Sequence, residues 1–572
     1  MKFSFAPPLI AVAAAVFAGP LVYFACGAAA AAPSPDPIHF ADITRPAGIR
    51  FVHNNGAFGQ KYLPETLGPG VAFIDYDNDG WQDIFFVNGT RWPGHPGQVT
   101  TPVLYRNNHD GTFTDVTRKA GLAVPMYGMG VAVGDYDNDG YDDLFVTAVG
   151  QSHLFHNNGN GTFTDVTRKA GLGGIHEFST GAAWIDDRRN GLLDLLVANY
   201  VQWSPQTDRY CTMDGKTKSY CTPETYKGAS LRLWRNRGNG TFYDATKQAG
   251  LYDPTSKSLG ITILDANQDG WPDIAVSNDT QPNKLYINNH NGTFTEEGVA
   301  AGIAYSNNGV VRAGMGIDAG DYNRSGYPSL LITNFSDQMI ALDQNQKNGL
   351  FLDVAPSSEI GRSSVLTLGF GCFFFDYNLD SWPDIYVADG HLDRDIERIQ
   401  QRIRYAEPPH LYRNLDGKGW EDVAAQMGAS FDAPRVARGA AYGDINNDGA
   451  PDIVITTNGG PAALFLNEGA TNHALRIKLI GTRSNRDGIG SVVSVQSATT
   501  SQKQMLRSGS SYLSASELVL TFGLGSSTRA SVVEVHWPRG AVDRLTNIPA
   551  DRIITIREGH GLVRSQPLQK RR

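Results

Sequence analysis

The residues of this chain best suited to chemistry form a nine-residue loop that runs from Asp75 to Asp83. Oxygen side chains stand at positions 1, 3, 5 and 9, and glycine stands at position 6, where the backbone must bend sharply. Hard oxygen donors on one tight turn are the ligands that calcium prefers. An EF-hand is excluded, because it needs flanking helices and a glutamate at position 12, where this chain has Phe86. The flanks are short β-branched and aromatic runs, so the loop is expected to join two strands.

This loop occurs seven times, intact or degenerate. The other copies begin at Asp135, Asp186, Asp265, Asp321, Asp376 and Asp444, at spacings of 51 to 79 residues. A repeat of this size, made of strands and turns, predicts a β-propeller with one loop per blade. A second signature between the loops, first seen at residues 104–122, is typical of two strands joined by a glycine-containing hairpin turn. Four strands per repeat and seven repeats predict an all-β fold with a seven-bladed propeller.

Five of the copies keep oxygen ligands at positions 1, 3, 5 and 9, and the residue at position 7 would add a backbone carbonyl. The alternative is a set of solvated turn carboxylates, but this would require the same spacing to recur by chance. We therefore predict about five structural Ca²⁺ sites. Their predicted ligands are Asp75, Asp77, Asp79, Trp81, Asp83, Asp135, Asp137, Asp139, Tyr141, Asp143, Asp265, Asn267, Asp269, Trp271, Asp273, Asp376, Asn378, Asp380, Trp382, Asp384, Asp444, Asn446, Asp448, Ala450 and Asp452.

Two copies are degenerate. In the third copy Arg188 stands at position 3, and its guanidinium could neutralise Asp186 and Asp194 in place of a metal. The fifth copy keeps a single carboxylate, that of Asp321. Both copies are predicted to bind metal weakly or not at all. The sixth copy keeps its ligands but has Ser381 at the glycine position, which weakens the expectation there.

The acidic balance of the chain is localised in these loops. The formal net charge is −9, and the ligand positions of the five best loops hold 17 aspartates, without which the charge would be about +8. Carboxylates that converge on one turn repel one another unless a cation lies among them. The acidity therefore indicates metal ligation. Binding of nucleic acid is not expected, since the sequence shows no basic patch with interleaved aromatic residues.

The N-terminal segment is typical of an exported protein. Residues 1–32 combine Lys2, an apolar run and a series of small residues, which predicts a signal peptide and not a stable membrane span. Acylation at Cys26, giving a lipoprotein, is an open alternative. Because exported proteins form disulfides, Cys211 and Cys221 are expected to be bonded. We expect a protein that is secreted or located in the periplasm or cell envelope.

Three further segments follow the signal peptide. Residues 38–470 are assigned to the propeller, and residues 38–44 match the fourth strand of a repeat, which the last repeat lacks. This strand should complete the last blade and close the ring. Residues 473–558 contain alternating runs that predict a small antiparallel β-domain, a sandwich. Residues 559–572 are expected to be a disordered basic tail.

The two faces of the predicted ring should differ. In an up-and-down blade the first and third hairpins share one face, so the calcium loops and the glycine turns lie together on a calcium-loop face. Long insertions at residues 89–102, 201–230 and 390–410 fall on the opposite, long-loop face. Long loops on a rigid scaffold commonly carry binding, so the long-loop face is the predicted recognition surface.

The motifs also resemble known families. The Asp-x-Asp-x-Asp-Gly-x-x-Asp loops, set between Gly-Val-Ala and Asp-Ile strands, resemble the FG-GAP/VCBS repeats of integrin α-type propellers. Segments at residues 484–490, 508–514, 522–525 and 535–540 are similar to the ASPIC/UnbV domain. The two together, with the Tyr-Cys…Tyr-Cys insertion, resemble the cartilage acidic protein family. This resemblance implies a secreted, calcium-binding propeller, but it does not define a molecular activity.

The sequence favours a binding role over an enzymatic one. It contains no Gly-x-Ser-x-Gly elbow, no His-Glu-x-x-His motif and no phosphate-binding glycine-rich loop. We predict a monomeric binding or adhesion module for an extracellular protein or glycan, without catalytic residues. The alternative, by fold analogy alone, is a polysaccharide lyase or hydrolase. Such an enzyme would need acid–base residues on the long-loop face, where His391, Asp393, Asp395 and Arg404 are candidates.

Overall fold

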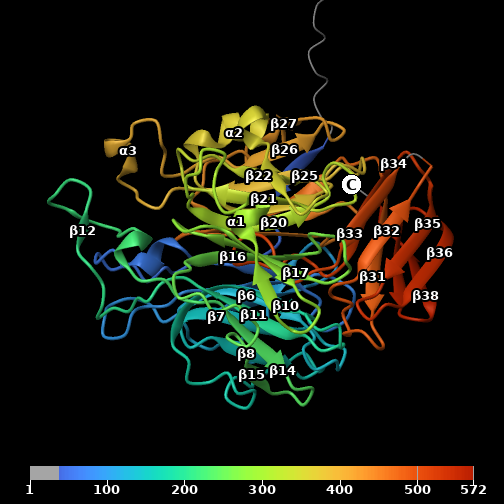
Figure 1. Cartoon of the computed structure of the whole chain (residues 1–572), viewed down its shortest axis with the longest axis horizontal. Coiled ribbons are helices and arrows are strands. Elements are labelled where there is room, and N and C mark those ends of the chain that lie inside the picture. Colours follow the sequence, from blue (N-terminus) through green and yellow to red (C-terminus); the bar gives the residue numbers. More distant parts are fainter. Residues whose placement is uncertain (1–37, 499, 571–572) are drawn as a thin grey trace, which may run out of the picture. The chain divides into compact units, whose positions relative to one another are not determined.

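The computed structural model describes residues 38–498 and 500–570 (Figure 1). The predicted signal peptide and Cys26 lie outside these residues. Strands dominate the described chain, and none of its helices is long and apolar enough to cross a membrane. The short helices are η1 (Leu63–Thr66), η2 (Pro223–Thr225), α1 (Gly298–Ala301), η3 (Ala355–Ser357), α2 (Glu359–Ser363), η4 (Ser364–Leu366), α3 (Ile396–Ile399) and η5 (Ala424–Gln426).

The described residues form seven four-stranded antiparallel units, one for each loop, which we call blades 1 to 7 in chain order; blades 2 and 3 are joined by pairing between their second and first strands into one eight-stranded sheet. Blades 1 to 3 consist of β2 (Val71–Ile74), β3 (Asp83–Phe86), β4 (Val103–Asn107) and β5 (Phe113–Asp115); β6 (Gly128–Gly134), β7 (Asp143–Gly150), β8 (His153–Asn157) and β9 (Phe163–Asp165); and β10 (Glu177–Ile185), β11 (Asp194–Asn199), β14 (Arg232–Asn236) and β15 (Phe242–Asp244). A small hairpin, β12 (Cys211–Thr212) and β13 (Lys218–Ser219), lies within the second insertion.

The remaining blades repeat this order. Blades 4 to 6 consist of β16 (Ser258–Leu264), β17 (Asp273–Asn278), β18 (Lys284–Asn288) and β19 (Phe294–Glu296); β20 (Gly314–Gly320), β21 (Ser329–Asn334), β22 (Ala341–Asn345) and β23 (Phe351–Asp353); and β24 (Gly369–Phe375), β25 (Asp384–Asp389), β26 (His410–Asn414) and β27 (Trp420–Asp422). Blade 7 consists of β28 (Ala437–Gly443), β29 (Asp452–Thr457), β30 (Ala463–Glu468) and β1 (His39–Asp42).

The blades form a closed ring. The inner strands β2, β6, β10, β16, β20, β24 and β28 contact one another in that order, and β28 also contacts β2. The N-terminal strand β1 pairs antiparallel with β30, with His39 opposite Glu468 and Asp42 opposite Phe465, as predicted. One strand from the start of the chain therefore completes the last sheet and covers its edge.

A glycine stands in, or immediately before, every inner strand, five residues before the first aspartate of the loop. A Cβ at Gly316 would lie 2.1 Å from the carbonyl oxygen of Phe370 in the next blade. Only glycine allows the inner strands to approach this closely. The seven are Gly70, Gly130, Gly181, Gly260, Gly316, Gly371 and Gly439.

The C-terminal domain is a sandwich of two four-stranded sheets around an apolar core, as predicted. One prediction was wrong in part, because β31 and β37 pair in parallel. A second was wrong because residues expected in a disordered tail form β38, whose backbone pairs with β37 although its side chains are mostly exposed. The strands are β31 (His473–Ile480), β32 (Val492–Gln496), β33 (Ser501–Met505), β34 (Leu520–Gly525), β35 (Arg529–His536), β36 (Val542–Pro549), β37 (Arg552–Arg557) and β38 (Gly561–Pro567).

An axial segment, residues 508–515, links β33 to β34 and inserts among the inner strands of the ring. The backbone N–H of Val131 donates to the carbonyl of Leu513 (3.1 Å), and that of Ile317 donates to Ser511 (3.1 Å). The buried Tyr512 packs against Phe370 with ring centroids 4.9 Å apart. The C-terminal domain thus contributes a segment to the packing at the centre of the propeller.

Candidate metal centre

All seven loops share one backbone conformation. Position 4 and position 6 have positive φ angles in every copy, for example 56° at Asn78 and 89° at Gly80 in the first loop. This holds for the two degenerate copies as well. The residues concerned are Asn78, Asn138, Arg189, Gln268, Arg324, Leu379 and Asn447 at position 4, and Gly80, Gly140, Gly191, Gly270, Gly326, Ser381 and Gly449 at position 6.

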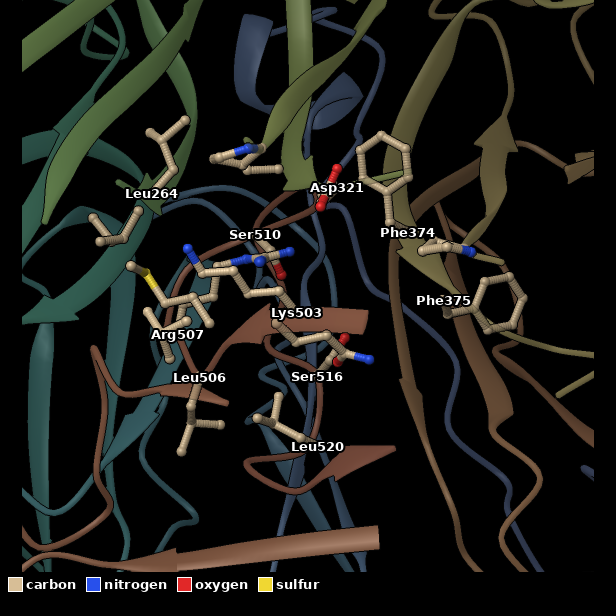
Figure 2. Close-up of a pocket in the computed structure, with 18 of the residues that line it drawn as sticks. Leu264, Asp321, Phe374, Phe375, Lys503, Leu506, Arg507, Ser510, Ser516 and Leu520 are labelled. Atoms are coloured by element: carbon tan, nitrogen blue, oxygen red, sulfur yellow. The ribbon is translucent and has the colours of Figure 1, made fainter. Parts of the chain in front are cut away.

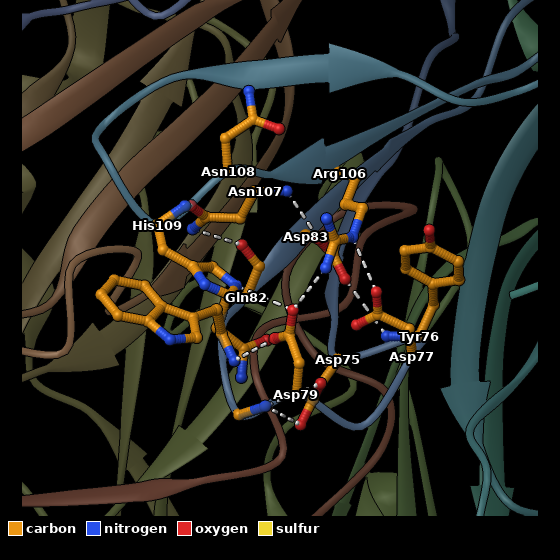
Figure 3. Close-up of polar contacts among 12 residues, drawn as sticks. Asp75, Tyr76, Asp77, Asp79, Gln82, Asp83, Arg106, Asn107, Asn108 and His109 are labelled. Atoms are coloured by element: carbon orange, nitrogen blue, oxygen red, sulfur yellow. Dashed lines mark hydrogen bonds and ion pairs between the residues drawn. The ribbon is translucent and has the colours of Figure 1, made fainter.

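In the first loop the turn's own N–H groups hold the carboxylates together (Figure 3). Asp75 accepts from the N–H of Gly80 at 3.2 Å, and Asp79 accepts from the N–H of Trp81 at 3.0 Å. Carboxylate oxygens of Asp75, Asp77 and Asp79 all lie within 4.8 Å of one another. Asp83 accepts from the backbone of Asn107 at 2.7 Å and from that of Tyr76 at 3.3 Å, which ties position 9 to the start of the loop.

Burial makes these carboxylates hard to ionise without a cation. Asp83 is 1% exposed, and burial first, then the charges of Asp77, Asp79 and Asp75, raise its pKa well above the usual range. In blade 4, burial raises the pKa of Asp273 to about 8. A divalent cation among such groups favours their ionised form. Converging, desolvated oxygen donors therefore fit calcium.

The second loop adds a residue that the sequence prediction missed. Oxygens of Asp135, Asp137 and Asp143 lie within 4.8 Å of one another. Nδ1 of His156 lies 3.4 Å from Asp137 and 3.3 Å from Asp143. His156 stands immediately before Asn157, which ends the third strand of the blade. In every repeat a leucine and an asparagine stand three residues apart in this strand, a Leu-x-x-Asn motif, and the position before the asparagine was the signal that could have identified His156.

In blade 1 the same position holds Arg106. Its Nε lies 2.7 Å from Asp77, and its Nη2 lies 3.0 Å from Asp79. The side chain at the position before the strand-ending asparagine therefore points toward the loop, and its charge adds to that of the loop carboxylates. It is apolar in blades 4 and 7, where Ile287 and Leu466 occupy it.

The loops of blades 4, 6 and 7 are more open: among the described residues, their three carboxylates do not all lie within 4.8 Å of one another, as those of the first two loops do. In each, the asparagine amide at position 3 donates to the aspartate at position 5, at 2.9 to 3.0 Å. Position 9 accepts from the backbone of the strand-ending asparagine at 2.8 Å.

The degenerate loops differ as the sequence suggested, with one correction. Nη2 of Arg188 lies 3.1 Å from Asp194, and its Nε lies 3.6 Å from Asp187. The expected contact with Asp186 was wrong, because that carboxylate accepts from the N–H groups of Asn190 and Gly191, both at 2.8 Å. The guanidinium thus forms no ion pair with Asp186; burial raises the pKa of that carboxyl, and the positive charge of Arg188 partly lowers it.

Replacing Ser381 by glycine is expected to stabilise the protein by about 1 kcal/mol, because its φ of 78° favours residues without a Cβ. The midpoint of chemical denaturation would measure this. The reverse change in blade 7, Gly449→Ser at φ 89°, should destabilise by a similar amount. A Ser381→Gly protein less stable than the parent would show that the serine hydroxyl outweighs the backbone cost.

Seven asparagines join each loop to its neighbour, a role the sequence prediction also missed. The side-chain amide of Asn157 donates to the carbonyl of Tyr76 in the preceding blade at 2.8 Å, and that of Asn107 reaches Ile445 at 2.8 Å across the ring closure. The same bond recurs around the ring at 2.7 to 2.9 Å. The full set is Asn107, Asn157, Asn236, Asn288, Asn345, Asn414 and Asn467.

The C-terminal domain contacts the aspartate-rich loops directly. Nζ of Lys478 lies 3.2 Å from Asp75, and Nη1 of Arg476 lies 3.2 Å from Asp444, so strand β31 supplies cations to the loops of blades 1 and 7. Asp487 accepts from the backbone of Asp135 at 2.7 Å. A cavity of about 120 Å³ lies between the domain and blades 4 to 6, lined in part by residues labelled in Figure 2.

Comparison with known proteins agrees with this architecture. The FG-GAP-like repeat model matches residues 75–146, 135–197, 213–276, 265–332 and 376–455, which is more than half of the chain. The chain belongs to the FG-GAP-like repeat family. Its C-terminal domain matches the ASPIC and UnbV model over residues 481–563.

Known proteins are similar to this FG-GAP-like repeat protein over shares of the chain that differ widely. Cartilage acidic protein 1 of Mus musculus is 23% identical over 505 residues, which cover 83% of this chain and 71% of the mouse protein. Integrin alpha-6 of Homo sapiens is 33% identical over 94 residues, 16% of this chain and 8% of the integrin. Among solved structures, the BP39L lectin of Burkholderia pseudomallei has a TM-score of 0.42 at 8% identity, covering 70% of this chain and 96% of the lectin.

On the long-loop face of the FG-GAP-like repeat protein, the insertions are packed together by aromatic rings. Cys211 and Cys221 form the predicted disulfide. The ring of Trp92 stacks on that of Tyr127 at 4.1 Å, and Tyr62 meets the rings of Trp92 and Trp203 at 5.5 and 5.3 Å. The first two insertions therefore have a defined conformation.

Of the four residues considered for acid–base chemistry, three lie close together and the fourth, Arg404, does not. His391 is 3% exposed, its Nδ1 accepts from the backbone of Asp393 at 3.2 Å, and burial lowers its pKa to about 4. Asp393 and Asp395 each lie 3.6 Å from Nζ of Lys61. Arg404 is exposed and pairs with a different acid, Glu397. His391 is thus neutral near pH 7, and Arg404 takes no part in this group.

Replacing Glu65 by glutamine is expected to stabilise the protein at pH 8 but not at pH 4. Burial raises the pKa of Glu65 to about 7, so the folded state holds its proton and loses stability as the pH rises from about 4.5 through 7. The gain at pH 8 should be on the order of 3 kcal/mol. Urea unfolding at both pH values would measure it. The exposed Glu397→Gln change should show no such pH dependence, and an equal effect of both variants would contradict the prediction.

Proposed function

We propose that this chain is an exported calcium-binding propeller that acts as a binding or adhesion module for an extracellular protein or glycan. The difference between the two faces supports this proposal. The calcium-loop face is contacted by the C-terminal domain through Arg476 and Lys478. The long-loop face carries the longest insertions, one of them tied by the Cys211–Cys221 disulfide. Ordered long loops on a rigid scaffold are where binding residues concentrate.

The metal has a structural role in this proposal. Calcium bound at the five loops would neutralise carboxylates that burial otherwise keeps protonated. The ligand residues follow the inner strands directly, so ordering the loops orders the ring. The resemblance to cartilage acidic proteins supports an exported, calcium-binding protein. We infer that calcium maintains the scaffold and does not contact the ligand.

Binding of the full exported chain to arrays of extracellular matrix proteins and glycans, in calcium, tests this role. A matched variant replaces residues 205–225 with a short Gly-Ser linker and so removes the disulfide-tied arm. We expect binding to fall at least tenfold while the circular dichroism spectrum stays unchanged. An array without binding, or equal binding by the variant, would contradict the proposal.

One observation favours a polysaccharide-acting enzyme as the second candidate. The buried acids Glu407 and Asp389 lie near each other on the long-loop face, and burial raises their pKa values to about 9 and 7. A carboxyl group that keeps its proton at neutral pH can act as a general acid. Release of unsaturated or reducing ends from acidic polysaccharides, abolished by Glu407→Gln, would support this alternative.

A further inference from the structure

The structure assigns a binding groove for a neutral saccharide to the long-loop end of blade 3, an inference that rests on the proposed function. The groove has a volume of about 920 Å³. Ligand sites in proteins typically measure about 300 to 1,000 Å³. Its walls come from the start of β10, both ends of the second insertion, and the connection from β15 to β16.

The charged groups of the groove neutralise one another. Arg232 contacts Glu177 at 2.6 Å and Asp244 at 2.7 Å, so both carboxylates of the described lining are paired. Nζ of Lys247 lies over the ring of Tyr252, 4.8 Å from its centroid. The two acids and two bases of the lining give no net charge. Within the described lining, Lys247 is the charged side chain without a carboxylate partner, and its ammonium lies over the Tyr252 ring. The groove therefore offers no cluster of free cations with which to select a phosphate, sulfate or carboxylate.

A ligand in the groove would therefore be bound by hydrogen bonds to uncharged side chains and by contact with an aromatic ring. The exposed side chains of Gln202, Gln248 and Thr207 line the groove. The NH2 group of Gln202 donates to the carbonyl of Gly228 at 3.0 Å. The hydroxyl of Thr207 donates to that of Ser204 at 3.2 Å, which leaves the oxygens of both side chains as acceptors.

Tyr252 is 52% exposed, while Trp203 is 8% exposed beneath the insertion. An exposed aromatic ring provides a flat apolar surface for the C–H face of a pyranose, and amides match its hydroxyl groups. A neutral polyhydroxyl ligand is the chemistry that this lining complements.

The groove is held in shape before any ligand binds. Nε1 of Trp203 donates to Asp208 at 3.0 Å, and Nζ of Lys218 donates to the same carboxylate at 2.7 Å. The Cys211–Cys221 disulfide closes the loop between them. A wall fixed in this way lowers the ordering cost of binding, which suits ligands with few strong contacts.

The test compares Tyr252→Ala with Tyr305→Ala, a matched exposed tyrosine outside the groove. The probes are neutral tetrasaccharides of mannose, galactose and N-acetylglucosamine, and an acidic heparin tetrasaccharide. Isothermal titration and ligand-observed NMR measure their affinities. We expect at least one neutral probe to bind, with affinity at least tenfold lower in Tyr252→Ala, unchanged in Tyr305→Ala, and insensitive to added salt.

Three outcomes would contradict the proposed saccharide site: no binding of any neutral probe, tighter binding of heparin than of the neutral probes, or an equal loss of affinity in both variants. The array experiment separates this inference from the proposed function. A signal that survives Tyr252→Ala but is lost when residues 205–225 are replaced would overturn the groove and leave the binding role in place. A signal that survives both changes would overturn both.

Discussion

Millimolar calcium is expected to raise the thermal unfolding midpoint of the EDTA-treated protein by about 6 °C, with about five ions bound per chain. Extracellular calcium sites commonly have dissociation constants of roughly 0.1 to 1 mM, so 10 mM calcium contributes about 1.4 kcal/mol per site or more. Five sites give about 7 kcal/mol, and the unfolding entropy of a chain this long converts this to the stated shift. Differential scanning calorimetry with metal analysis would measure both.

Two variants make this result specific to the loops. Asp273→Asn, in an intact loop, should remove one ion from the stoichiometry. Asp186→Asn, in the loop where Arg188 already pairs with Asp194, should leave it unchanged. A midpoint that calcium does not move, with no bound metal, would overturn the structural calcium sites. Equal shifts by magnesium would show that the sites are not selective for calcium.

Replacing Tyr512 by alanine is expected to destabilise the protein by about 4 kcal/mol, the cost of removing a large buried aromatic side chain. Tyr512 is fully buried, packs on Phe370, and its hydroxyl donates to the carbonyl of Leu67 at 3.0 Å. Guanidinium chloride unfolding followed by tryptophan fluorescence would measure the loss.

The conservative change Tyr512→Phe keeps the packing and loses only one hydrogen bond, so it should cost about 1 kcal/mol. The ratio of the two effects separates packing from hydrogen bonding. If Tyr512→Ala costs less than about 1 kcal/mol, the axial segment is not part of the cooperative unit of the propeller.

The sequence predicted what depends on local spacing and missed what depends on distant contacts. The aspartate spacing predicted the loops and their strands, because a turn and its flanks are encoded within some twenty residues. The contacts of Arg476 and Lys478 with the loops could not be predicted, since more than 400 residues separate Lys478 from Asp75. Strand β36 was missed because its side chains are mostly exposed, as in an edge strand whose order comes from backbone pairing.

The degenerate loop of blade 3 shows the same limit. The sequence correctly suggested that Arg188 takes part in charge pairing, but the choice between Asp186 and Asp194 depends on which carboxylate closes the turn. Similarly, the Leu-x-x-Asn motif was visible in every repeat. The hydrogen bond that the asparagine of this motif donates to the preceding blade can be recognised only in the folded ring, where neighbouring blades pack against each other.

The axial segment also has a consequence for how the protein is made. During synthesis all seven sheets can form before residues 508–515 have been translated, and β1 must wait for β30 to emerge. A chain that stops before this segment would therefore leave the centre of the propeller without the backbone hydrogen bonds that Ser511 and Leu513 accept from the inner strands.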